Sequence, residues 1–78
     1  MRDRKADKAK WEELHHMWVL ASQKAREKQA EITSMYAACA HGRGTGPTDE
    51  MLFDLEYLDR QAQHALLAEN AFLKEVFG

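Results

Sequence analysis

The sequence is poor in the residues that build disulfide frameworks, sheets and membrane spans. Its 78 residues include one cysteine, one proline and four glycines. A single cysteine excludes an internal disulfide and a zinc site built from several cysteines. Three residues are valine or isoleucine whereas twelve are alanine, a balance that favours helix over sheet. No apolar run approaches the roughly 18 residues of a transmembrane helix.

A strong charge of either sign is also lacking. Eleven Lys and Arg stand against thirteen Asp and Glu, a net charge of −2, which demands no polyanionic partner. Residues 1–14 are highly charged and contain no apolar segment of a secretory signal, so we expect a cytoplasmic protein. A chain of this length forms one small domain, whose stability is marginal unless its helices pack well or chains associate.

Glycine and proline gather at one place in the chain. Residues 42–47 read Gly-Arg-Gly-Thr-Gly-Pro and hold three of the four glycines and the single proline. Because both residues disfavour helix interiors, the break belongs here. We predict one domain over residues 1–78, with a helix over about 4–41, a turn over 42–47 and a second helix over about 48–76. Gly42 suits the left-handed residue that closes a helix, and Thr48 suits the N-cap of the next.

Each predicted helix carries one apolar stripe with alternating steps of three and four residues. Lys28 interrupts the first stripe and Glu69 interrupts the second. This spacing is typical of coiled coils, and a short turn makes the neighbours antiparallel. The fold class is therefore predicted to be all-α, an antiparallel, coiled-coil-like helical hairpin. The stripes consist of Trp11, Leu14, Trp18, Ala21, Ala25, Lys28, Ile32, Met35 and Cys39, and of Met51, Leu55, Leu58, Ala62, Ala65, Glu69, Phe72 and Val76.

Folding the stripes about residue 45 predicts how they pair. Ala25 then lies opposite Ala65, and Glu69 lies near Ala21. Charge favours the same pairing of the two rods, because residues 1–43 carry nine basic and six acidic side chains whereas residues 44–78 carry two and seven. Each exposed ion pair adds only about 0–1 kcal/mol.

Several apolar residues lie outside the stripes, where a two-helix chain has nothing to cover them. We expect this outer band to form an interaction surface: Phe53, Tyr57, Leu67, Val19 and Leu20. Self-association into a four-helix bundle, as a twofold dimer, would bury it. The alternatives are a lone hairpin with an apolar back, or a groove for a helix of another protein.

Four residues near the N-terminus are candidate metal ligands. Glu12 and His15, like Glu13 and His16, have the Glu-x-x-His spacing of di-iron helical bundles. Glu12, Glu13 and His16 project away from the stripe, however, and Glu69 registers beyond them. We therefore expect His15 and His16 to be solvated or to lie at the rim of the interface, with no metal and no cofactor.

The remaining polar features have structural interpretations. Glu69 and Lys28 are expected to set register or to extend their side chains to water, with acidic residues of the second helix available to the lysine. Cys39 is expected to be a buried, inert thiol because it lies near a helix C-terminus, whose dipole disfavours a thiolate. The glycine string is expected to be a turn, because no strand precedes it and no Gly-Lys-Ser/Thr follows.

Basic residues in the first helix offer an alternative function. A nucleic-acid-binding hairpin dimer could use Arg2, Arg4, Lys5, Lys8, Lys10, Lys24, Arg26 and Lys28. Six interleaved acidic residues dilute that face, and nucleic-acid-binding domains are usually far more basic.

The sequence contains no nucleophile paired with a base, and a two-helix chain offers little concave surface for a substrate. We therefore expect a small non-catalytic interaction or adaptor protein that acts through helix-face packing. A nucleic-acid-binding hairpin dimer and, behind it, a metal-binding four-helix bundle are the alternatives.

Overall fold

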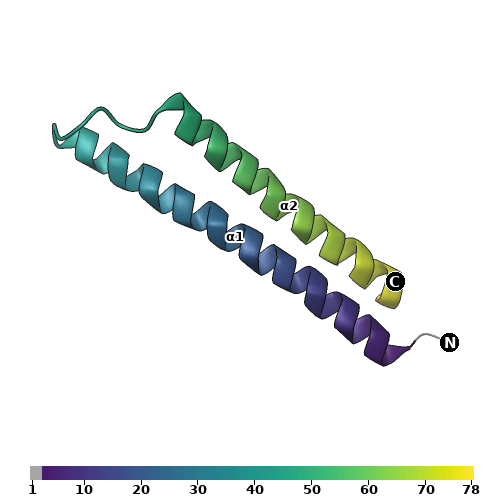
Figure 1. Ribbon diagram of the computed structural model, residues 1–78. Coiled ribbons are helices and arrows are strands. Elements are labelled where there is room, and N and C mark those ends of the chain that lie inside the picture. The colour runs from purple at the N-terminus through teal and green to yellow at the C-terminus, as the bar shows by residue number, and fades with distance from the viewer. Residues whose placement is uncertain (1–2) are drawn as a thin grey trace.

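The computed structural model describes residues 3–78 as two long helices joined by a loop. Helix α1 spans Arg4–Ala40 and helix α2 spans Asp49–Phe77, and the two lie side by side in antiparallel order (Figure 1). No strand occurs among the described residues. The predicted all-α helical hairpin is confirmed, and its dimerisation stays a prediction.

Both helices begin at a side chain that accepts a hydrogen bond from the first turn. The carboxylate of Asp3 accepts from the backbone N–H of Lys5, 2.9 Å away, and the hydroxyl of Thr48 accepts from that of Met51 at 3.2 Å. These bonds satisfy amides that have no partner within the helix. The predicted N-cap at Thr48 is confirmed.

Helix α1 ends in a Schellman motif, as the glycine at position 42 predicts. Gly42 has a φ of +73°, a conformation that L side chains rarely adopt. Its N–H donates to the carbonyl of Cys39 at 3.0 Å, and the N–H of Arg43 donates to that of Ala38 at 2.7 Å. The two bonds satisfy carbonyls of the last turn and turn the chain out of the helix axis.

The loop returns along the end of α1 before α2 begins, so the hairpin is not symmetric about residue 45 (Figure 1). Gly44 and Gly46 both have positive φ, and the backbone of Gly46 lies beside Cys39. Glu69 consequently lies at His15, six residues from its predicted neighbour Ala21. The predicted register is wrong because it assumed a compact, symmetric turn.

Cys39 is exposed, which corrects the predicted buried thiol. At this level α1 is accompanied by the loop, and Gly46, which lies beside Cys39, has no side chain. The thiol therefore lacks the cover that a helical neighbour would provide.

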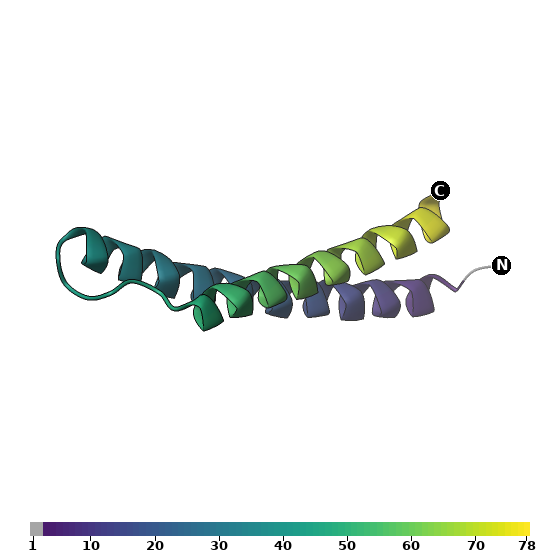
Figure 2. The same ribbon diagram turned by 90° about the horizontal axis from the view of Figure 1, so that it is seen from above.

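The hairpin is a rod with very little interior. Its extents are 63 × 16 × 16 Å, and the helices cross at a shallow angle (Figure 2). Within the described residues, the buried apolar side chains are those of Ala25 and Ile32. The radius of gyration is 17.7 Å, against about 11.5 Å for a compact chain of this length. Neither helix has a stretch that is long and apolar enough to span a bilayer, over the residues that the structure describes.

Candidate functional site

The most unusual buried group in the hairpin is the carboxylate of Glu69. Only 7% of this residue is exposed, and its Oε1 lies 3.0 Å from Nδ1 of His15 on the other helix. Because a carboxylate accepts hydrogen bonds, Nδ1–H of His15 is the donor. The predicted extension of Glu69 to water is wrong, since a partner inside the interface holds the side chain instead.

Two indole rings flank the imidazole that makes this bond. Trp11 stacks on His15 with ring centroids 4.8 Å apart and planes at 15°, and Trp18 lies 5.6 Å from it at 39°. The spacing of these residues, four and then three, places all three rings on one face of α1. The rings fix the imidazole in the orientation that meets Glu69.

The His15–Glu69 pair was missed because the assumed register separated its members. The available signal was the glutamate itself, since a charged residue within an apolar stripe needs a polar partner on the facing helix. Catalysis by the pair would also need a nucleophile. The nearby hydroxyl of Ser22 donates to the carbonyl of Val19 at 3.1 Å and so serves its own helix.

The second interruption, Lys28, is half-buried and reaches the surface. Its ammonium lies 3.4 Å from the carboxylate of Glu31, one turn further along α1. The side chain of Lys28 therefore extends toward water as expected. Its acidic partner, however, lies on α1 and not on the second helix.

The four candidate metal ligands do not form one cluster. Glu12, Glu13 and His16 are exposed, Glu12 pairs with Lys8 at 3.7 Å, and His15 is engaged by Glu69. Within residues 3–78, no three His, Cys, Asp or Glu side chains converge as metal ligands would.

Basic residues of α1 are accompanied by acids of the same helix. Lys8 pairs with Glu12 and Lys28 with Glu31, which lowers the positive potential that a phosphate would meet. Arg2 lies outside the described residues.

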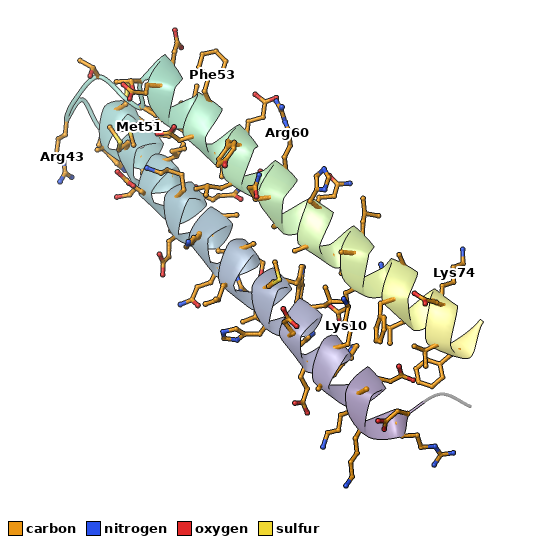
Figure 3. All side chains as sticks on the ribbon, turned by 45° about the vertical axis from the view of Figure 1, so that its right-hand side comes forward. Lys10, Arg43, Met51, Phe53, Arg60 and Lys74 are labelled. Atoms are coloured by element: carbon orange, nitrogen blue, oxygen red, sulfur yellow. The ribbon has the colours of Figure 1, made fainter. Side chains whose placement is uncertain are left out.

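The outer band is largely exposed but does not form one patch. Phe53 is 67% exposed, Tyr57, Leu67 and Leu20 are also exposed, and Val19 is half-buried. Phe53 points away from α1 (Figure 3). Phe53 and Tyr57 are one turn apart, whereas Leu67 lies ten residues further along α2 and the other two belong to α1.

A groove between the two helices opens at the end of the hairpin where α1 begins and α2 ends. We call it the open-end groove, and both apolar and charged side chains line it. It is lined by Arg4, Asp7, Lys8 and Trp11 of α1, and by Phe72, Leu73, Val76 and Phe77 of α2.

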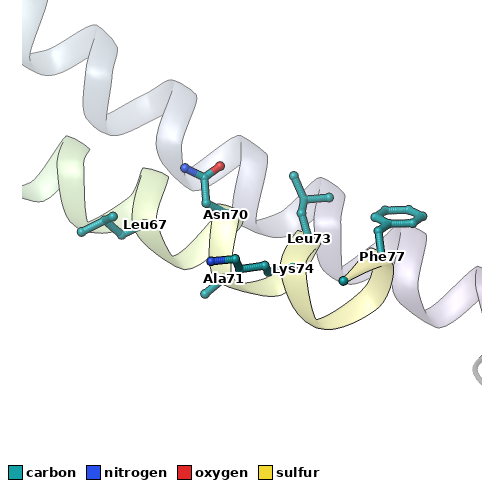
Figure 4. Close-up of a pocket in the computed structure, with 7 residues that line it drawn as sticks. Leu67, Asn70, Ala71, Leu73, Lys74 and Phe77 are labelled. Carbon is teal, nitrogen blue, oxygen red and sulfur yellow. The ribbon is translucent and has the colours of Figure 1, made fainter.

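The apolar surface continues from this groove around the end of α2. Leu73 and Phe77 also line a shallow hollow with Leu67 and Asn70 (Figure 4). Phe77 is 82% exposed, although a phenyl ring gains from leaving water. Adjoining apolar side chains therefore lie without a cover at this end of α2.

Comparisons with protein-family models, with curated proteins and with solved structures find no match to this chain. The candidate site accordingly rests on the residues themselves.

Proposed function

We propose that this chain is a small, non-catalytic interaction protein that acts by packing its helices against helices of other chains. Its primary partner is a second copy, with which it forms a four-helix bundle. The observation that carries the proposal is the amount of surface that one hairpin leaves in water.

The accessible surface of the chain is 6304 Å². A compact monomeric protein of 9.0 kDa exposes about 4,900 Å². The excess of roughly 1,400 Å² lies in the range that each subunit of an obligate dimer buries. Dimerisation would thus remove about as much surface as the rod shape adds.

The outer band supports an adaptor role beside self-association. Phe53 points away from α1, and Tyr57, one turn further along α2, is also exposed, so a helix of another protein could pack on them. We also propose a cytoplasmic location. The exposed free thiol of Cys39 favours a reducing compartment.

Light scattering during size-exclusion chromatography tests self-association. We expect twice the 9.0 kDa mass of one chain, and a mass of one chain at the highest attainable concentration would refute the bundle. The adaptor role predicts a protein that is retained by the wild-type chain and lost with Phe53→Ser. Identical sets of retained proteins would argue against the outer band.

A further inference from the structure

We propose that two copies pack through one particular flank of the hairpin, with their open ends together and the twofold axis along the rods. This inference rests on the proposed self-association and adds the contact face and the orientation. Three observations carry it: the open-end groove, the seven-residue spacing of the side chains beside the stripes, and the charge of the two helices.

The open-end groove identifies the face. Lys8 lines it from α1 and Leu73 lines it from α2. Residues seven apart share one side of a helix in a coiled coil. Steps of seven from Leu73 toward the start of α2 reach Leu66, Asp59 and Leu52, so two of these three residues are leucines. Both of these leucines are partly exposed. We call this side of the hairpin the groove flank.

The groove flank on α1 carries polar as well as aromatic residues. Steps of seven from Lys8 reach His15, Ser22, Gln29 and Tyr36, and the ring of Tyr36 is exposed. The opposite flank, which directly precedes every second stripe position, is mostly polar. It carries Lys10, Met17, Lys24, Glu31 and Ala38 on α1, and Asp54, Gln61, Ala68 and Glu75 on α2. Burial of the groove flank therefore removes far more apolar surface than burial of the opposite flank.

Charge selects the orientation. Helix α1 contains seven Lys and Arg against five Asp and Glu, whereas α2 contains two against seven. A twofold axis along the rods sets α1 of one copy over α2 of the other, so opposite net charges face each other. An axis across the rods sets α2 over α2, and two acidic helices would repel.

The same orientation brings the two open-end grooves together. The large side chains at the groove, Trp11, Phe72 and Phe77, then lie at the same end of the bundle as those of the second copy. Because a twofold contact is self-complementary, the exposed ring of each Phe77 has the partner's groove within reach. If the two copies packed with their open ends opposed, each groove would instead face the loop end of the other copy.

The single cysteine provides a labelling site from which this orientation can be measured without any substitution. Cys39 is exposed and lies at the loop end of α1. With open ends together, spin labels on the two Cys39 thiols should lie below about 30 Å apart, since neighbouring helix axes are about 8–10 Å apart. With open ends opposed, the rise of 1.5 Å per residue along α1 separates them by about 50 Å.

Double electron–electron resonance on the labelled dimer measures the distance between the two spin labels. A short distance supports the proposal. A dimeric mass with a distance near 50 Å would overturn the orientation while leaving self-association intact. A monomeric mass would remove both.

Two lysine variants test the face. Leu66 on the groove flank is 38% exposed and Met17 on the opposite flank is 54% exposed, so the hairpin should tolerate a lysine at either position. Leu66→Lys should raise the dimer dissociation constant by about tenfold or more, whereas Met17→Lys should leave it unchanged. The reverse result, or equal effects, would overturn the assignment of the face, and circular dichroism verifies that both variants keep their helices.

Discussion

Glu69 shows how one polar residue is accommodated in an interface between two helices. Its carboxylate is largely withdrawn from water, with 9% of the side chain exposed, and accepts one hydrogen bond from His15, whose side chain remains 39% exposed. Removing a charged group from water is costly, and a single bond offsets that cost in part. The two members of the pair are therefore unequal, because the histidine is much more open to water than the glutamate.

This inequality predicts opposite effects of two substitutions. His15→Ala should lower the free energy of unfolding by about 1–3 kcal/mol, because it leaves a buried carboxylate without its donor and removes the ring between Trp11 and Trp18. Glu69→Leu should leave stability unchanged or raise it, because an apolar side chain replaces a desolvated charge.

Urea denaturation at one fixed protein concentration measures both effects. The control is His16→Ala, which alters an exposed neighbour of the same type. If Glu69→Leu destabilised the protein as much as His15→Ala, the pair would be a net source of stability and the argument from desolvation would fail.

At the scale of elements, the end of α1 and the loop determine where α2 lies. The Schellman motif at Gly42 turns the chain, and positive φ at Gly44 and Gly46 lets it return along α1. The start of α2 and the level of Glu69 both follow from this path. The loop therefore contributes to register as much as the facing side chains do.

Gly42→Ala should lower the free energy of unfolding by about 1–2 kcal/mol, because alanine is strained at positive φ. Nothing lies within 4 Å of a Cβ added there, so the loss would be conformational and not steric. Thr45→Ala, in the same loop, should change stability by less than about 0.5 kcal/mol. Chemical denaturation compares the two, and equal losses would show that the motif does not limit stability.

At the scale of the whole molecule, the rod exposes more surface than a compact chain of its mass. Among the described residues, the buried apolar side chains are those of Ala25 and Ile32. One hairpin therefore gains little free energy from the hydrophobic effect. If the bundle supplies the missing burial, folding and association are one process. The stability of the chain then depends on its concentration.

A tenfold increase in protein concentration should raise the melting temperature by several degrees, since mass action adds about 1.4 kcal/mol per mole of dimer. Circular dichroism melts across a dilution series measure the shift. Leu66→Lys should flatten the dependence. A melting temperature that is constant over the series would mean that the hairpin folds alone.

The sequence predicted the features that depend on neighbouring residues. The break at residues 42–47, the closing glycine at 42 and the cap at Thr48 follow from backbone preferences and from hydrogen bonds within a few positions. The alternating steps of three and four predicted which helix faces meet. These signals are local, so they can be read without the fold.

Features that join distant residues were decided by the tertiary structure. Both apolar stripes allow several registers, because sliding one helix by a layer still sets apolar residues opposite each other. The path of the loop selected the register in which Glu69 meets His15 and in which Gly46 leaves Cys39 exposed. The helices and their ends were thus determined by the sequence alone, whereas the partner of the buried charge depended on packing between residues 54 positions apart.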